Sequence, residues 1–215
     1  MNSTGSGVAD TTRQPAFGRH LVITGVGRSG SSFLIQLLTR LGLETGIDSG
    51  LDVSPPARAG FELRLRDPDA PYVVKCPMLC DFADEVLSSG DLQIDHALIP
   101  VRRFDAAAAS RAHVQAETTG AADGRDVVAG GLWDTDNSTE QAAILRLKFT
   151  RLIEALVRYD VPMTFLSYPR LVRDPDYTYR KLRFLLPDVT HDAFAEAFGE
   201  LVKPAWVHQF TDDDK

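Results

Sequence analysis

The stretch from Leu21 to Leu38, LVITGVGRSGSSFLIQLL, constrains the fold more than any other part of the chain. Its first four residues are apolar or β-branched, which is typical of a strand, and Gly25, Gly27 and Gly30 follow. From Phe33 onward, apolar residues recur with a helical period. Backbone N–H groups at the start of a helix have no intrahelical acceptor and lie at the positive end of its dipole. The stretch therefore predicts a strand, a glycine loop and a helix that together bind a phosphate.

Several kinds of loop fit this outline. The interval from Gly25 to Gly30 matches a Walker A loop, but Ser31 stands where the phosphate-binding lysine is expected. The three-glycine spacing also matches a dinucleotide fingerprint, for which Glu44 lies about twenty residues past the strand, although its neighbours make a poor strand. An ATP- and Mg²⁺-dependent phosphotransferase, a nicotinamide-dependent oxidoreductase, a non-enzymatic nucleotide-binding protein and an ordinary glycine-rich turn thus stay open.

The side chains of the loop favour another interpretation. Arg28 stands among three hydroxyl residues, a set suited to holding a terminal phosphate by charge and several hydrogen bonds. The segment GRSGSS resembles the phosphosulfate-binding loop of sulfotransferases. The resemblance implies 3′-phosphoadenosine 5′-phosphosulfate (PAPS) as donor and its bisphosphate (PAP) as product. It implies that six residues hold the phosphosulfate group: Gly27, Arg28, Ser29, Gly30, Ser31 and Ser32.

A lysine at the end of the next predicted strand is the second candidate. The segment YVVKCP is apolar up to Lys75, and strand ends in a parallel sheet face the ligand crevice. Gly60-Phe61-Glu62 is similar to an element near the acceptor in bacterial sulfotransferases. The resemblance implies that Lys75 approaches the transferred group. Glu62 is the first choice for the base that takes the acceptor proton, with Asp81 and His96 behind it.

A third candidate follows the segment DHALIPV, which also has the pattern of a strand. Arg102 and Arg103 come directly after it, and Ser110 follows eight residues beyond Arg102 on a predicted alanine-rich helix. Solvated arginines at an ordinary strand-to-helix corner are the alternative. The spacing resembles the 3′-phosphate element of sulfotransferases and implies that Arg102 and Ser110 hold that phosphate. Arg28 and Lys75 would then stabilise the charge that develops on the leaving phosphate.

Two irregular segments are expected to form the acceptor pocket. Residues Gly46–Pro71 are broken by prolines and glycines, and only Phe61–Leu65 has a regular pattern. Residues Ala116–Asn137 carry four glycines and are expected to be a mobile loop over the acceptor, with Trp133 as an apolar plate. The identity of the acceptor, a small molecule with a hydroxyl or amine, cannot be read from these segments.

The rest of the chain continues the alternation of strands and helices. Ser138 and Gln141 have the spacing of a capping box at the start of a long helix, whose solvated side is expected to include Lys148. Pro162–Ser167 is predicted to be a buried strand. The segment Tyr168–Pro175 after it partly resembles a segment that follows a late strand in sulfotransferases.

Length and charge complete the expectation. The 215 residues suit one α/β domain over residues 20–210, after a disordered leader (1–19) and before an acidic tail (211–215). Together with the resemblance, the alternation predicts a P-loop NTPase-like, three-layer α/β/α fold with a parallel sheet of about four or five strands. The net charge of −7 argues against nucleic acid, and the absence of a long apolar run argues against a membrane. Cys76 and Cys80 are too few for a disulfide scaffold or a metal site. We expect a cytoplasmic enzyme, with the choice between monomer and homodimer open.

Overall fold

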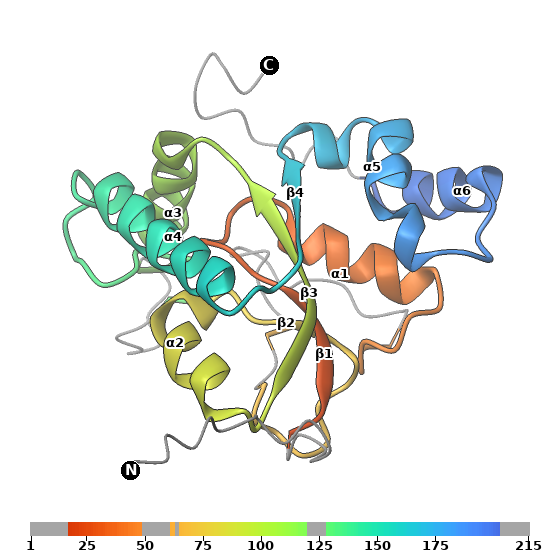
Figure 1. Ribbon diagram of the computed structural model, residues 1–215. Coiled ribbons are helices and arrows are strands. Elements are labelled where there is room, and N and C mark those ends of the chain that lie inside the picture. Colours follow the sequence, from red (N-terminus) through yellow and green to blue (C-terminus); the bar gives the residue numbers. More distant parts are fainter. Residues whose placement is uncertain (1–16, 49–60, 63–64, 120–127, 203–215) are drawn as a thin grey trace, which may run out of the picture.

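Four parallel strands in the order β2-β1-β3-β4 form the sheet of this protein (Figure 1). The computed structural model describes residues 17–48, 61–62, 65–119 and 128–202. Within them the elements are β1 (Arg19–Ile23), α1 (Ser31–Arg40), β2 (Val73–Lys75), α2 (Leu79–Ser89), β3 (Gln93–Val101), α3 (Phe104–Thr119), α4 (Gln141–Arg158), β4 (Met163–Ser167), η1 (Arg170–Val172), α5 (Pro175–Leu182), η2 (Arg183–Leu185) and α6 (His191–Leu201).

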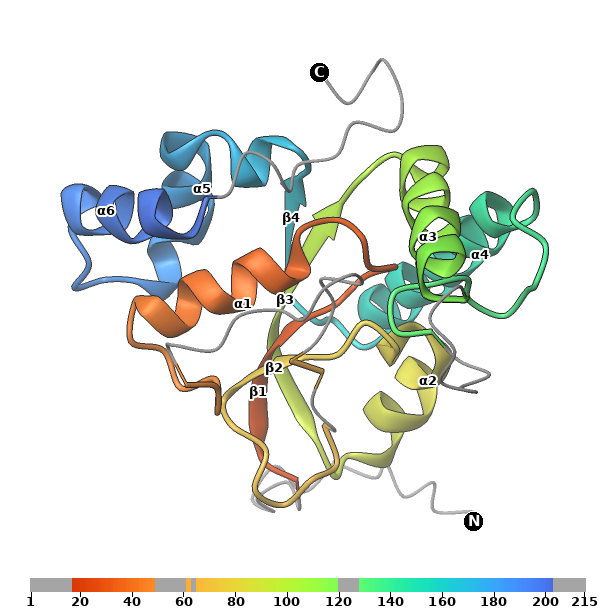
Figure 2. The same ribbon diagram turned by 180° about the vertical axis from the view of Figure 1, so that it is seen from behind.

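Helices cover both faces of the sheet. Helices α1, α5 and α6 lie on one face, and α2, α3 and α4 lie on the other (Figures 1 and 2). This arrangement follows from the strand order, because the chain steps from β1 to β2 in one direction and then returns past β1 to β3, which reverses the face on which right-handed connections lie. The predicted α/β class with a parallel sheet and two helical layers is confirmed.

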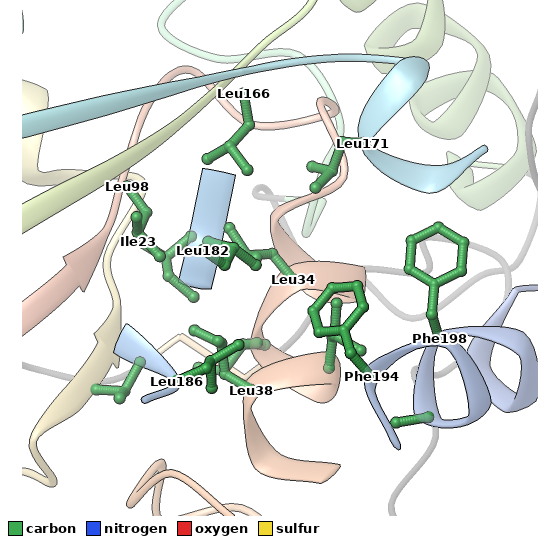
Figure 3. Close-up of a cluster of buried hydrophobic side chains, with 14 of the residues drawn as sticks. Ile23, Leu34, Leu38, Leu98, Leu166, Leu171, Leu182, Leu186, Phe194 and Phe198 are labelled. Atoms are coloured by element: carbon green, nitrogen blue, oxygen red, sulfur yellow. The ribbon is translucent and has the colours of Figure 1, made fainter. Parts of the chain in front are cut away.

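The alternation of side chains along β1 divides the core in two. Leu21 and Ile23 are fully buried on the face of α1, where they join Leu34 and Phe194 in one apolar cluster (Figure 3). Val22 points to the opposite face and belongs to the cluster formed with α2 and α4. A strand whose residues are buried on both faces is central to a sheet, which explains the continuous apolar run in the sequence.

The strand β4 differs from its prediction. It covers the predicted segment except for its first residue, Pro162, but in the described sheet it is an edge strand and pairs only with β3. Leu166 is the buried residue of this strand, whereas Phe165 is 42% exposed. The prediction of a buried strand was wrong because a short, mainly apolar segment does not reveal whether a second neighbouring strand covers it.

Several predictions concern segments outside the described residues. Residues 1–16 of the predicted leader and the tail from 211 to 215 lie there, and so do residues 49–60 and 63–64 of the first irregular segment. The first strand begins at Arg19, within the predicted leader. None of the helices in the described part of the chain has the length and apolar character needed to cross a bilayer.

His96 on β3 gives the fold a predictable response to acid. Burial lowers the pKa of its imidazole below the ordinary value of 6.5, and its Nε2 atom lies 2.8 Å from Oγ1 of Thr164. Because the pKa of His96 is lower in the folded state than in the unfolded state, the neutral ring contributes its full share of the unfolding free energy above the unfolded-state pKa of about 6.5. This share is lost as the pH falls from about 6.5 through the lower pKa of the folded state. We expect His96→Gln, which reaches Thr164 without titrating, to lose less unfolding free energy between pH 7 and pH 5 than the unmodified protein does. Urea denaturation at both pH values measures this, and equal losses in the two proteins would contradict it.

Candidate functional site

The carboxyl ends of three neighbouring strands bring the predicted residues together. Because β1 lies between β2 and β3, the loop that follows β1 is flanked by the ends of both (Figure 1). Lys75 is the last residue of β2, and Arg102 directly follows Val101, the last residue of β3. The crevice outside strand ends, where the order of connections reverses, is the usual place for a ligand in such sheets.

The glycine loop between β1 and α1 is tightly wound. Gly27, Arg28 and Gly30 have φ angles of +72°, +56° and +90°, which glycine adopts freely and other residues rarely do. A Cβ atom at Gly27 would lie 2.8 Å from Nη2 of Arg111, and one at Gly30 would lie 3.1 Å from Cδ2 of Leu171. Gly30 is also the N-cap residue of α1, so no side chain caps the first turn of this helix. The first turn of the helix therefore has no side-chain cap, an arrangement suited to binding an anion at a helix N-terminus.

The two predicted phosphate elements contact each other. The Nε atom of Arg28 donates a hydrogen bond to Oγ of Ser110 at 3.1 Å, and Nη1 of Arg102 donates to the carbonyl oxygen of Arg28 at 3.3 Å. The guanidinium carbon of Arg102 lies 4.7 Å from the ring centroid of Tyr168, which follows β4. Arg102 and Ser110 are buried. A charged group that is buried and stacked in this way has its position fixed by the fold.

Lys75 lies on the other side of the loop. Its side chain is 2% exposed, and its Nζ atom donates to Oγ of Ser32 at 3.0 Å and to Oε1 of Glu62 at 2.8 Å. Burial lowers the pKa of the Lys75 ammonium; the charge of Glu62 opposes this and the charge of Arg28 adds to it. The carboxylate of Glu62 is partly exposed, at 35% of its side chain. Ser32, Lys75 and Glu62 thus form a chain of contacts from the helix start to solvent.

The two other candidates for the base lie elsewhere. The carboxylate of Asp81 forms an ion pair with Lys148 on α4. His96 pairs with Leu21 inside the sheet, and its ring is bonded to Thr164 on β4. His96 is therefore a packed histidine and not part of the strand-end crevice, and Asp81 is committed to a different cation.

The two cysteines that follow Lys75 are structural. Both thiols are free and buried. Burial raises the pKa of Cys76 to about 11 and that of Cys80 to about 12. Both therefore stay protonated and unreactive near neutral pH. The described residues contain no group of three or more metal-binding side chains.

The segment around Trp133 differs from the predicted mobile loop. Helix α3 continues to Thr119, so the loop begins later than residue 116, and residues 120–127 lie outside the described part of the chain. The backbone N–H of Trp133 donates to Oε1 of Gln141 at 2.6 Å, and Nε2 of Gln141 donates back to the carbonyl of Trp133 at 3.2 Å. Gln141 is the first residue of α4 and Glu140 is the N-cap, so the predicted capping box with Ser138 was wrong. The side chain of Gln141 instead fixes the segment before the helix.

Lys148 was predicted to lie on the solvated side of α4 and is buried. Its ammonium forms ion pairs with Asp81 and, at 2.5 Å, with Asp134, and it lies 4.5 Å from the ring centroid of Trp133. Burial acts to lower the pKa of Lys148, but the hydrogen bonds and charges of Asp134 and Asp81 outweigh it and raise the pKa above its ordinary value. The helical period alone gave no signal of this burial, because the partners come from α2 and from the loop.

Replacing Lys148 with methionine is expected to destabilise the fold by about 2 kcal/mol, less than a fully buried ion pair because both carboxylates keep contact with water. The variant leaves Asp81 and Asp134 without their cation. The control is Arg158→Met, which removes an exposed ion pair to Asp84 between the same two helices and is expected to have little effect. Urea denaturation compares the two, and equal losses would contradict the role of burial.

Arg111 is the residue of this region that sequence reasoning missed. It lies one position beyond Ser110 on α3 and is 7% exposed. Its Nη2 atom donates to the carbonyl of Val26 at 2.7 Å, and its Nη1 atom donates to the carbonyl of Gly131 at 2.7 Å. An arginine in an alanine-rich helix has the pattern of a solvated residue, so its contact with the glycine loop had no sequence signal.

The described residues form an α/β protein in which the predicted phosphate-binding residues lie together at the carboxyl ends of β1 and β3, beside Lys75 at the end of β2. No family model, curated protein or solved structure matches this chain. The function must therefore be argued from the residues that the fold brings together.

Proposed function

We propose that this protein is a sulfotransferase that moves a sulfuryl group from PAPS to a hydroxyl or amine of a small molecule, on a P-loop NTPase-like fold. The observation that carries the proposal is the contact between its two anion-binding elements. Arg28 of the glycine loop bonds to Ser110, and Arg102 bonds to the backbone of Arg28. A donor with phosphates at both the 5′ and 3′ positions needs two such elements side by side, whereas a single phosphate group needs only one.

The residues present fit a nucleotide of this kind. The uncapped first turn of α1 has backbone N–H groups for an anion, and Arg28, Ser31 and Ser32 add a cation and two hydroxyls in and next to this turn in the sequence. These groups would hold the 5′-phosphosulfate, together with Gly27, Ser29 and Gly30. Arg102 and Ser110 would hold the 3′-phosphate. The positive φ angles and the close approach at Gly27 and Gly30 support a cradle that only small residues can form.

When bound, the donor supplies an activated sulfuryl group, whose bond to phosphate breaks as the acceptor oxygen or nitrogen bonds to sulfur. The chain supplies charge and orientation for this exchange. The ammonium of Lys75 lies beside Ser32 at the helix start, where it would stabilise the negative charge left on the phosphate together with Arg28. Both cations are held in place before the ligand arrives, which limits the cost of reorganisation.

Glu62 is the proposed base. Its carboxylate is bonded to Lys75 yet keeps a partly exposed side chain, so an acceptor can approach it from solvent. The proton of the acceptor hydroxyl or amine would pass to Glu62 as the new bond forms. The ion pair with Lys75 would orient the carboxylate toward the end of the glycine loop.

One observation favours a second candidate, an ATP- and Mg²⁺-dependent phosphotransferase. The Nζ atom of Lys75 lies at Ser32, so an ammonium from β2 stands at the helix start, although Ser31 occupies the Walker lysine position in the loop. Phosphoryl transfer uses a similar cationic clamp. The contact of Arg102 and Ser110 with Arg28, together with Ser31 at the Walker lysine position, favours the sulfotransferase over the phosphotransferase.

Calorimetric titration separates these functions. The sulfotransferase proposal expects adenosine 3′,5′-bisphosphate to bind more tightly than ATP with Mg²⁺ or NAD, and without dependence on Mg²⁺. Preferential binding of ATP with Mg²⁺ would refute it in favour of the phosphotransferase. Tight binding of NAD would instead support an oxidoreductase. Bisphosphate binding with no transfer to any hydroxyl or amine in a panel of acceptors would favour a non-enzymatic nucleotide-binding protein.

A further inference from the structure

Arg111 is a buried cation directly behind the glycine loop. It donates from one end of its guanidinium to Val26, in the loop, and from the other to Gly131, two residues before Trp133. The guanidinium carbon lies 4.9 Å from the ring centroid of Trp133. The two terminal nitrogens of the planar guanidinium therefore join the glycine loop to a segment about a hundred residues later in the chain. Lysine has a single nitrogen and cannot make both bonds in this geometry.

The charge of Arg111 is compensated by dipoles. No carboxylate within the described residues forms an ion pair with it, and its Nε atom is buried without a hydrogen-bond partner. Burial and the nearby charge of Arg28 lower the pKa of Arg111 to about 10, so it still carries its charge near neutral pH. A buried cation without a carboxylate is costly, and a bound anion would reduce that cost. The positive charge thus adds to the attraction of the loop for an anion.

The guanidinium of Arg111 packs closely against the loop backbone at Gly27. The distance of 2.8 Å from Nη2 of Arg111 to the position of a Cβ atom at Gly27 leaves no room for a side chain there. The glycine therefore lets the guanidinium approach the loop backbone closely enough to bond to Val26. A movement of the loop on binding an anion would be transmitted to Arg111 and from it to Gly131 and Trp133.

We propose that Arg111 is a positioning residue that places a positive charge behind the glycine loop and, through its two hydrogen bonds, couples the loop to the Trp133 segment. The inference rests on the proposed function in that it takes the glycine loop as the donor site. It assigns two separable contributions to one side chain. The charge favours the anion, and the fork-shaped bridge transmits its binding to Trp133.

Two substitutions separate these contributions. Arg111→Lys keeps the charge but has a single nitrogen, so we expect it to bind adenosine 3′,5′-bisphosphate within about threefold of the unmodified protein while losing the bridge. Arg111→Gln loses the charge and one of the two bonds, and we expect about 10- to 100-fold weaker binding. The chain has two tryptophans, so each protein is made with Trp206→Phe, which leaves Trp133 as the only indole.

The readout is the fluorescence of Trp133 during titration with the bisphosphate. With Arg111 present, we expect the emission to change along the same curve as binding measured by calorimetry. In Arg111→Lys we expect binding without the change in emission. The matched control is Arg146→Gln on α4, which removes another cation near an aromatic ring, 5.8 Å from the centroid of Phe104, but one that is half-exposed and paired with Asp105. It is expected to leave both measurements unchanged.

Hydrogen exchange of the free proteins provides a test that needs no ligand. Peptides that cover residues 25–32 and 128–133 are expected to exchange about tenfold faster in both Arg111 variants than in the Arg146 control. Failure of the unmodified protein to bind the bisphosphate would refute the proposed function, and the exchange measurement would still decide the role of Arg111. Unchanged exchange, or a Trp133 response that persists in Arg111→Lys, would overturn the inference. If Arg111→Gln does not fold, Arg111→Lys alone decides it.

Discussion

Arg102→Ala is expected to weaken the binding of adenosine 3′,5′-bisphosphate by about 10- to 100-fold, because it removes a charge-assisted hydrogen bond from a buried site. The guanidinium is stacked on Tyr168 and bonded to the backbone of Arg28, so it is already positioned for a phosphate. Ser110→Ala is expected to weaken binding less, because it removes a neutral hydroxyl that orients Arg28. Calorimetric titration measures both losses.

Arg103→Ala is the matched control for charge. Arg103 is the same type of residue at the next position, but it is exposed. We expect its replacement to leave the affinity nearly unchanged. Equal losses for Arg102 and Arg103 would mean that the bisphosphate responds to the general charge of the corner and not to a built site. Arg102→Lys and thermal unfolding of each variant distinguish lost contacts from a damaged fold.

Lys75→Met is expected to reduce the rate of sulfuryl transfer by about 10²- to 10³-fold, since it removes a buried, preorganised cation from the end of β2. Methionine preserves most of the buried volume at the end of β2. Binding of the bisphosphate should change much less than turnover, because Arg28 and Arg102 remain. Formation of the bisphosphate from PAPS in the presence of a panel of alcohols, phenols and amines measures the rate. An unchanged rate would exclude Lys75 from the chemistry.

Glu62→Gln tests the partner of Lys75. The amide keeps a polar contact with Lys75 but cannot take a proton, so we expect about a 10²-fold fall in rate. Since the two residues act as a unit, the double variant with Lys75→Met should be little worse than either single variant. Glu85→Gln is the control, because it removes the exposed ion pair to Arg66. A comparable loss in that variant would point to a general effect of acidic residues.

The lowered pKa of Lys75 also predicts how the reaction rate changes at alkaline pH. Lys75 is charged below its pKa, and burial brings this value below the ordinary 10.5. The rate should therefore fall on the alkaline side at a lower pH than that of an exposed lysine. In Lys75→Arg this fall should be displaced to higher pH, because guanidinium keeps its charge there. A pH profile of the rate in both proteins tests this.

The parts of the site that the sequence could predict share a local signal. The glycine loop is a contiguous pattern, and Lys75 and Arg102 each follow an apolar run that ends in a charge. Because parallel strands end at one edge of a sheet, those local patterns were enough to place the three elements near one another. The observed contacts among Arg28, Arg102 and Ser110 agree with that reasoning.

The residues that could not be predicted owe their burial to distant backbone and side-chain groups. Arg111 and Lys148 both lie on helices at positions where a long cation normally reaches water. Arg111 is buried because carbonyl groups of Val26 and Gly131 meet it, and Lys148 is buried because Asp81 and Asp134 do. No periodicity encodes such partners, since they come from other segments of the chain. The exposure of β4 could not be predicted for a related reason, because its own sequence does not show that in the described sheet it pairs with β3 alone.

The central position of β1 determines when the site can form during synthesis of the chain. The contacts at the candidate site join positions 43, 74, 82 and 85 apart in the chain, and Tyr168, which contacts Arg102, follows the last strand. The glycine loop leaves the ribosome early and must wait for most of the chain before it can hold an anion. Because Arg102 and Ser110 come 74 and 82 residues after Arg28, no N-terminal fragment that ends before them should retain the ligand. If the protein is the proposed sulfotransferase, binding of the bisphosphate would report completed folding, and it should raise the melting temperature of the whole domain as one unit.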